Sequence, residues 1–237
     1  MCGFFAFSTG KSAREIADIF GLTNLPSSYA DLKSDILSLK HYPKSLIPTI
    51  SQNSPNLLIM RYWSLIPRWW KQDLTDLKFS TFNARSEDMA TKATYRTPWQ
   101  SAQRCLIPST WFYEFQTLEN DGRKYKQPFK VFDPDTEIMT LAGLYEEWQS
   151  PSQQKLASVT IITCQSVGEL ATIHHRQPVI IKEEDRQRWL SKQTSPSQAS
   201  DLLGPEPNLK VRAIDRAFNK SFGQDVTQKM LNGSSFS

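Results

Sequence analysis

From Asn56 onward, the chain consists largely of short segments rich in β-branched and aromatic residues. Four of these segments have the length and composition of strands, namely residues 57–63, 128–132, 138–145 and 157–163. Turn signals separate them, such as Asn-Asp-Gly at 120–122 and Pro-Asp at 134–135. Because short strands of this kind must cover one another's apolar faces, they predict a sheet-based fold with mostly antiparallel strands.

Helical signals lie on both sides of this strand-rich region. Ser12 and Glu15 have the form of a capping box, and the apolar pattern behind them ends at Gly21, which predicts a short amphipathic helix. Residues 29–40 carry apolar side chains at helical spacing. Residues 183–190 place acids in the first turn and arginines later, which suits the helix dipole. The fold class expected is therefore α+β, with helices flanking mostly antiparallel strands.

The chain shows no convincing linker, so we expect one domain over residues 1–225. Residues 194–208 are predicted to be mostly loop, with about one turn of helix. Residues 226–237 end in small and polar residues and are predicted to form a disordered tail.

Composition excludes several classes of protein. No segment approaches the roughly 18 consecutive apolar residues of a membrane span, and no basic segment with a cleavage site marks a signal peptide. Three widely spaced cysteines argue against a disulfide framework and favour a reducing cytoplasmic location. No Cys/His cluster has the spacing of zinc ligands. A net charge of +4 permits a polyanionic partner without requiring one.

The second residue of the chain is a cysteine. If Met1 is removed, Cys2 carries both an α-amine and a thiol, whose ordinary pKa values are about 8 and about 8.5. Such an aminothiol can form a Schiff base with an aldehyde and then close a thiazolidine ring. Alternatively, its thiol can attack an acyl carbon with its own amine as base. Residues 3–7 are strand-like and apolar, so we expect Cys2 to be carried on a buried element.

Residues 81–87 place Asn83, Arg85 and Glu87 at every second position, which puts them on one face if the segment is a strand. The amide of Asn83 suits holding a neutral amine, and Arg85 offers a bidentate fork for phosphate. A salt-bridged polar strand face explains the same pattern equally well.

Two further segments carry groups suited to proton transfer. Glu114 is a lone carboxylate within the aromatic segment 111–115, where burial would raise its pKa. His174 lies in the segment 174–178, and alternation along a strand would place it on the face of Arg176, with His175 on the other face. A buried glutamate paired with an arginine and a structural histidine are the alternatives.

Trp69 and Trp70 are adjacent and precede Lys71. Neighbouring residues of a strand face opposite sides, so at least one of the two should be exposed. An exposed aromatic ring beside a cation is typical of a surface that binds single-stranded nucleic acid, because bases stack and phosphates pair with cations.

Together these segments resemble the SRAP (SOS response-associated peptidase) family. Cys2-Gly3 matches the family's processed N-terminal Cys-Gly, and residues 83–87 match its Asn-Ala-Arg-x-Glu segment. Residues 104–108, leading to Glu114, match the strand that bears its catalytic glutamate. Residues 174–178 match its His-x-Arg-x-Pro motif.

The resemblance covers about residues 1–190 and implies an SRAP-like domain. It implies a sensor of abasic sites in single-stranded DNA that forms a thiazolidine cross-link through Cys2. Strand cleavage by β-elimination and removal of Met1 by the protein itself are implied accompanying activities. It implies a monomer without cofactor or metal, associated with the nucleoid when bound to DNA. Five positions depart from the family pattern. Phe4 replaces a usual arginine, Ser45 a usual asparagine, Ser64 a common glycine, Trp111 a usual small residue and Phe115 a common tryptophan.

The roles expected from the resemblance fall into two sets. The catalytic set holds the amine and moves protons, and it comprises Cys2, Asn83, Glu114 and His174. The DNA-binding set contacts phosphates and bases, and it comprises Arg85, Arg104, Arg176, Trp69 and Trp70.

Two other functions remain compatible with the opening residues. Class II glutamine amidotransferases also begin Met-Cys-Gly and hydrolyse glutamine with the amine of the cysteine as base. The segments around Glu114 and His174 would then have no role. A non-catalytic nucleic-acid-binding module would be favoured if Met1 were retained.

Overall fold

The computed structural model describes residues 2–7, 9, 11–23 and 40–216. Five of its strands close into a barrel in the order β10, β4, β3, β6, β9 and back to β10. Their bounds are β3 Leu46–Ser51, β4 Ser54–Trp63, β6 Arg104–Ser109, β9 Met139–Gln149 and β10 Lys155–Gln165. All neighbours are antiparallel except β4 and β10, which run parallel. Closure leaves these five strands without a free edge.

Two short strands extend this sheet at the C-terminal half of β10. β5 (Asn83–Arg85) runs parallel to β10, and β11 (Arg176–Pro178) runs antiparallel to it. The register places Thr163 opposite both Arg85 and Pro178. The segments with Asn83 and His174 therefore reach the same end of the barrel, although 91 positions separate the two residues in the sequence (174 − 83 = 91).

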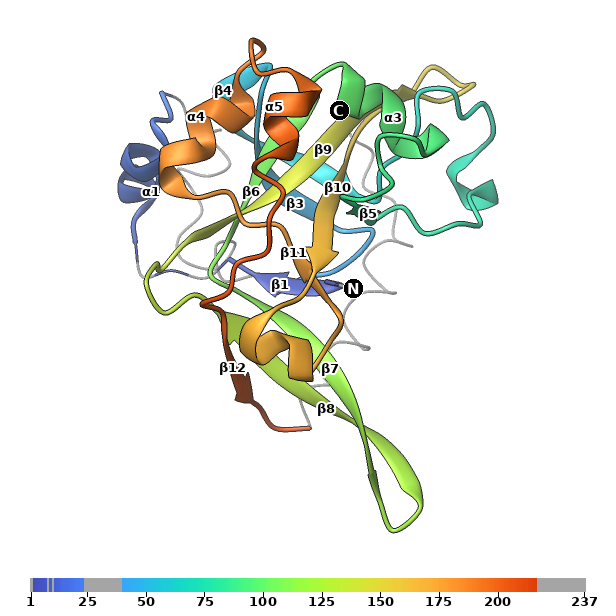
Figure 1. Cartoon of the computed structure of the whole chain (residues 1–237). Coiled ribbons are helices and arrows are strands. Elements are labelled where there is room, and N and C mark those ends of the chain that lie inside the picture. Colours follow the sequence, from blue (N-terminus) through green and yellow to red (C-terminus); the bar gives the residue numbers. More distant parts are fainter. Residues whose placement is uncertain (1, 8, 10, 24–39, 217–237) are drawn as a thin grey trace.

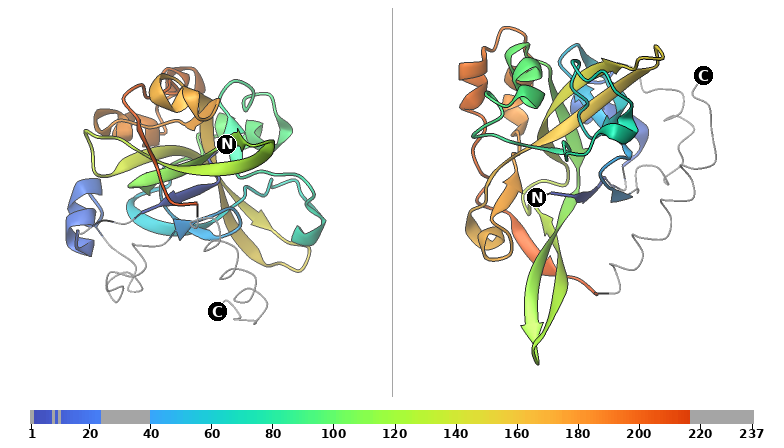
Figure 2. Two further views of the ribbon diagram at one scale, coloured as in Figure 1. Left: turned by 90° about the horizontal axis from the view of Figure 1, so that it is seen from below. Right: turned by 90° about the vertical axis from the view of Figure 1, so that its right-hand side faces the viewer.

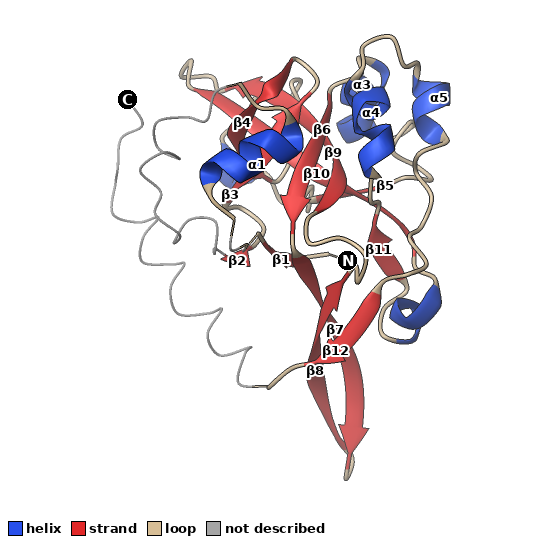
Figure 3. Ribbon diagram, turned by 90° about the vertical axis from the view of Figure 1, so that its left-hand side faces the viewer, coloured by secondary structure: helices blue, strands red, loops and turns tan. Residues whose placement is uncertain are grey.

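A second sheet of five strands lies below the barrel, in the order β12, β8, β7, β1, β2 (Figure 1). Its bounds are β1 Phe4–Ala6, β2 Lys40–His41, β7 Trp111–Asn120, β8 Arg123–Phe132 and β12 Lys210–Ala213. The hairpin of β7 and β8 projects away from the body of the molecule (Figures 1 and 3). Only Thr110 separates β6 from β7, so the chain passes directly from the barrel into this sheet. Strand β1 lies where the two sheets meet (Figure 2).

Short helices cover the barrel (Figure 3). Their bounds are α1 Ala13–Phe20, α3 Ala93–Gln100, α4 Arg186–Leu190 and α5 Pro196–Ser200, with 3₁₀ turns η1 Leu74–Asp76, η2 Gly168–Thr172 and η3 Glu183–Asp185. The predicted capping box at α1 is confirmed, since the Ser12 hydroxyl accepts from the Glu15 amide and the Glu15 side chain accepts from the Ser12 amide. Gly21 ends that helix at φ +61°, a conformation that favours glycine.

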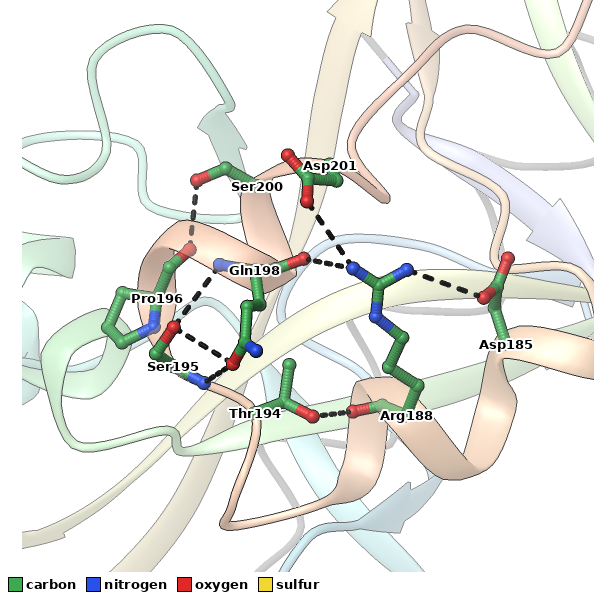
Figure 4. A network of polar contacts seen from close by, with 8 residues as sticks. All are labelled: Asp185, Arg188, Thr194, Ser195, Pro196, Gln198, Ser200 and Asp201. Atoms are coloured by element: carbon green, nitrogen blue, oxygen red, sulfur yellow. Dashed lines mark hydrogen bonds and ion pairs between the residues drawn. The ribbon is translucent and has the colours of Figure 1, made fainter.

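Arg188 joins α4 to α5 (Figure 4). Its guanidinium donates to the carbonyl of Gln198 at 3.0 Å and lies 3.3 Å from the carboxylate of Asp201. A second capping box, from Ser195 to Gln198, starts α5. The sequence predicted mostly loop with about one turn of helix over residues 194–208, and the structure confirms this, with α5 as the helical turn.

The strand predictions are confirmed, with longer bounds in the structure. Residues 128–132, for example, form only the second half of β8. The predicted helix at 183–190 is a 3₁₀ turn followed by α4. Most of the predicted helix at 29–40 and all of the predicted tail at 226–237 lie outside the described residues. Within the described part of the chain, no helix is both long and apolar enough to cross a membrane.

Candidate active site

Cys2 is buried where the barrel meets the second sheet. Its side chain has no exposed surface, and it packs in a hydrophobic cluster with Phe5, Trp63 and Phe112, which we call the Cys2 cluster. Strand β1 is held on both edges, because Phe5 pairs with Phe112 of β7 and with His41 of β2. The prediction that Cys2 is carried on a buried element is thus confirmed.

Asn83 contacts Cys2 directly. Its side-chain nitrogen Nδ2 donates to the carbonyl oxygen of Cys2 at 2.8 Å, and the hydroxyl of Tyr95 donates to the Asn83 carbonyl at 3.0 Å. The sequence predicted a contact to the amine, whereas the structure shows Asn83 on the carbonyl. The side-chain oxygen Oδ1 of Asn83 is buried, and no described residue donates a hydrogen bond to it. A buried acceptor of this kind suits an amine donor.

Glu114 and His174 face each other. Glu114 lies on β7 with 3% of its surface exposed, and its Oε2 is 3.9 Å from Nδ1 of His174. The backbone amide of Arg176 donates to this same Nδ1 at 3.1 Å. The imidazole is therefore oriented by the main chain of its own segment.

Burial sets the protonation of all three ionisable groups at the site. It raises the pKa of Glu114 to about 7, the shift expected from the sequence. It lowers the pKa of His174, which favours a neutral imidazole at neutral pH. Burial, together with the negative charge of Glu114, raises the pKa of the Cys2 thiol. A protonated thiol must lose its proton to a nearby base before it can act as a nucleophile.

The histidine segment differs from the predicted alternation. His174 and His175 precede β11 and are not part of it, because the chain bends at this point. Their rings pack together with centroids 4.5 Å apart. The prediction of opposite faces for the two histidines was wrong for this reason.

Two of the three predicted phosphate-binding arginines are engaged inside the protein. The guanidinium of Arg176 is mostly buried, donates to both carboxylate oxygens of Glu87 and also donates to the Thr163 carbonyl. This pairing lowers the pKa of Glu87 to about 2. Arg85, at the end of β5, is exposed. It remains the arginine of the predicted set whose side chain faces solvent.

Arg104 corrects the sequence prediction. Its side chain is completely buried, and its guanidinium donates to the carbonyls of Trp189, Ser191 and Thr194 at 2.7–2.8 Å. A cation that satisfies three carbonyls at the end of α4 is not available to a phosphate. Arg104 therefore holds α4 and the following loop onto β6.

Trp69 and Trp70 lie in a turn after β4 and not on a strand. Trp69 is 47% exposed, as predicted for at least one of the pair, and Trp70 is half-buried. Two contacts fix this turn to β9. Arg68 pairs with the buried Glu146 at 2.9 Å, and the indole nitrogen of Trp148 donates to the Trp70 carbonyl at 2.7 Å.

Sequence reasoning did not single out Tyr95 and Gln116. Tyr95 supports Asn83 from α3, and nothing in its local sequence indicates this. Gln116 donates to the Thr172 carbonyl at 2.8 Å and ties β7 to the turn that precedes His174. Its position two residues after Glu114 was the available signal, since alternate strand residues share a face.

A closed barrel, with a buried cysteine at position 2 beside an asparagine, a glutamate and a histidine, defines a narrow class of proteins. The family model described as "SOS response associated peptidase (SRAP)" matches residues 1–221. The chain belongs to this family.

Relatives and solved structures agree with this assignment. The abasic site processing protein YoqW of Bacillus subtilis is 34% identical over 163 residues, which cover 68% of this chain and 70% of YoqW. The abasic site processing protein HMCES of Rattus norvegicus is 27% identical over 213 residues, covering 78% of this chain and 58% of HMCES. A crystal structure from Bacteroides thetaiotaomicron, 23% identical, has the same fold with a TM-score of 0.78 over 92% of this chain and 94% of that one.

Proposed function

We propose that this protein captures abasic sites in single-stranded DNA by forming a covalent bond through Cys2 after removal of Met1. The observation that carries the proposal is the meeting of Cys2, Asn83, Glu114 and His174 at one end of the barrel. The relatives named abasic site processing proteins support the same substrate.

The chemistry needs no cofactor. An abasic nucleotide opens in part to an aldehyde at C1′, and the α-amine of Cys2 adds to this carbon to give a carbinolamine. Loss of water leaves a Schiff base between the amine nitrogen and C1′. The thiol then adds to C1′, its proton passes to the nitrogen, and a thiazolidine ring results. The product is protein plus DNA minus one water.

The protonation states at the site suit this order of events. Glu114, with a pKa of about 7, can donate a proton to the departing hydroxyl and later accept one. The thiol stays protonated until the Schiff base has formed, because burial raises its pKa. His174 is largely neutral and can exchange a proton with the sugar hydroxyl that ring opening releases.

The Schiff base also acidifies C2′ of the sugar. Loss of that proton leads to β-elimination and cleavage of the strand, so a weak lyase activity is part of the proposal. Closure of the thiazolidine removes the C=N bond and thereby suppresses this branch.

DNA contacts outside the reacting atoms come from two exposed residues. Arg85 is exposed at the end of the strand that carries Asn83, so a phosphate beside the abasic sugar is within its reach. Trp69 is exposed on a fixed turn and supplies a stacking surface for a base.

The amidotransferase alternative leaves part of this site unused. Glutamine hydrolysis by Cys2 would need only its own amine as base. It gives no role to Glu114, whose charge helps to raise the pKa of the Cys2 thiol, or to His174, which lies 3.9 Å from Glu114.

The test is a denaturing gel and intact mass spectrometry after mixing the protein with a single-stranded oligonucleotide that carries one abasic site. We expect an adduct of protein lacking Met1 plus DNA minus one water. It should disappear in Cys2→Ala and persist in Cys164→Ala, a matched change of another buried thiol. An undamaged oligonucleotide should give no adduct. Absence of an adduct from protein with a free Cys2 amine would overturn the proposal, and release of ammonia from glutamine would then support the alternative.

A further inference from the structure

A groove of about 420 Å³ opens between the end of β4 and the segment that leads into β5. One wall comes from the turn at Pro43 and Lys44 and from Tyr62 of β4. The other wall comes from the segment 74–82, which crosses the right-hand side of Figure 1 in teal. The site described above does not use this groove.

The groove is aromatic. Tyr62, Phe79 and Phe82 line it, and Phe79 is 42% exposed. The ring of Phe79 packs edge-on against Trp70 with centroids 5.9 Å apart, so it is held in place although part of it is exposed. Flat rings on both walls of a groove of this size match a flat aromatic ligand.

The polar groups of the groove favour an anionic ligand. Lys44 and Lys78 are both exposed along it, and Ser80 adds an exposed hydroxyl group. Among the described residues that line it, none is an aspartate or glutamate. A ligand with a flat π surface and an attached phosphate complements this lining.

The groove is next to the capture site. Phe82 directly precedes Asn83, whose side chain holds the Cys2 carbonyl, and consecutive Cα atoms are about 3.8 Å apart. The ring of Phe82 packs against the Cys2 cluster, and its carbonyl accepts from the indole nitrogen of Trp63 at 2.8 Å. Phe82 therefore both lines the groove and packs against the residues that surround Cys2.

We propose that this groove binds the base of one nucleotide immediately adjacent to the abasic nucleotide, with Lys44 or Lys78 on its phosphate. The inference rests on the proposed function, because it places the neighbouring nucleotide by reference to Cys2. A stacked neighbour would fix the position of the abasic sugar along the strand. The protein would then bind an abasic site most tightly when the neighbouring nucleotide keeps its base.

The experiment separates base binding from covalent capture. Oligonucleotides carry a tetrahydrofuran analogue, which has no aldehyde, with the fluorescent base 2-aminopurine on its 5′ or its 3′ side. Binding is followed by 2-aminopurine fluorescence and by anisotropy of an end label. The variants are Phe79→Ala in the groove and Tyr125→Ala on the projecting hairpin, the latter as a matched aromatic control.

We expect the fluorescence of the 2-aminopurine on one side to change on binding by the wild-type protein. Phe79→Ala should abolish that change and weaken binding by about 5- to 150-fold, the range for loss of one stacked base. Tyr125→Ala should leave both unchanged. No change on either side, or an unaltered change in Phe79→Ala, would overturn the inference.

Two further measurements complete the experiment. A free nucleoside monophosphate at millimolar concentration should not reproduce the Phe79-dependent effects. If it binds in the groove with high affinity, the ligand is a free nucleotide and the inference is wrong. Capture of a natural abasic site is measured separately. Loss of capture with normal Phe79-dependent stacking would overturn the proposed chemistry while leaving the groove as a base-binding site.

Discussion

At the scale of single residues, the site depends on burial. Glu114 is buried, and burial disfavours the charged form of its carboxyl group and raises its pKa to about 7. A carboxyl group with this pKa can donate a proton near neutral pH. The same burial keeps the nearby thiol protonated. Local environment, and not residue type, assigns these roles.

Glu114→Gln should slow adduct formation by about 100-fold or more, because the amide cannot transfer a proton. Single-turnover gels over a time course measure the rate. The control is Glu119→Gln, the same change at an exposed carboxyl further along β7. An unaltered rate in Glu114→Gln would contradict the role given to this carboxyl.

The same substitution should change how stability depends on pH. The folded protein keeps the Glu114 proton up to about pH 7, whereas the unfolded chain releases it near 4.5. Between these values the folded state binds more protons, so the free energy of unfolding falls as pH rises. Above pH 7, Glu114→Gln should therefore be more stable than the wild type, by on the order of 2 kcal/mol. Urea unfolding at pH 5 and pH 8 tests this, and equal stability of the two proteins at both pH values would contradict it.

Arg104→Met tests the corrected role of a residue that the sequence assigned to DNA. Loss of the donor to three carbonyls should lower the free energy of unfolding by on the order of 3 kcal/mol. The salt dependence of DNA binding should stay the same under conditions in which the variant is folded. Full stability with weakened binding would restore the phosphate role.

Two departures from the family pattern contact each other. Phe4, in place of the usual arginine, packs edge-on against Phe115, in place of a common tryptophan, with ring centroids 5.9 Å apart. The pair forms an apolar contact across β1 and β7 beside the capture site.

At the scale of elements, the turn with Trp69 is the clearest DNA-binding candidate. It is exposed, yet Arg68 and Trp148 anchor it to β9. Trp69→Ala should weaken binding of a single-stranded oligonucleotide by about 5-fold or more. The midpoint of thermal unfolding should change little, because about half of the Trp69 side chain is exposed. Unchanged affinity in fluorescence anisotropy would contradict the assignment.

Strand β9 shows how closely the barrel packs. A Cβ on Gly143 would lie 2.8 Å from the Cys105 sulfur and 2.9 Å from Cδ1 of Ile107. Gly143→Ala should therefore destabilise the fold by about 1–3 kcal/mol through overpacking. Chemical denaturation measures this, with Gly204→Ala as a control, since nothing lies within 4 Å of a Cβ there. A neutral Gly143→Ala would show that the barrel relaxes easily.

At the scale of the whole molecule, the barrel collects groups that are far apart in the chain. β10 supports both β5 and β11, and β7 enters from the second sheet. Asn83, His174 and Glu114 meet for this reason. No local pattern contains that information, because it depends on strand register and barrel closure.

The affinity of the protein for single-stranded DNA should fall as the salt concentration rises, because cationic side chains bind phosphates. For single strands, the slope of log affinity against log salt is about −0.7 for each phosphate neutralised. Arg85→Ala should make this slope shallower by about 0.7, because one phosphate contact is lost. Arg176→Lys should leave the slope unchanged, because this arginine pairs with Glu87 and not with phosphate. Titrations at several salt concentrations measure the slope. A slope near zero in the wild type would contradict phosphate binding altogether.

The sequence by itself determined the strand segments, the first helix and its cap, the α+β class and the family, because these depend on local periodicity and short motifs. It also predicted that burial among aromatic residues would raise the pKa of Glu114, which the structure bears out. Only the tertiary structure decided the roles of the arginines. Arg104 and Arg176 look like Arg85 in the sequence, but carbonyl and carboxylate partners brought from distant segments hold them inside. A side chain's chemistry is local, whereas its availability is set by what the fold packs around it.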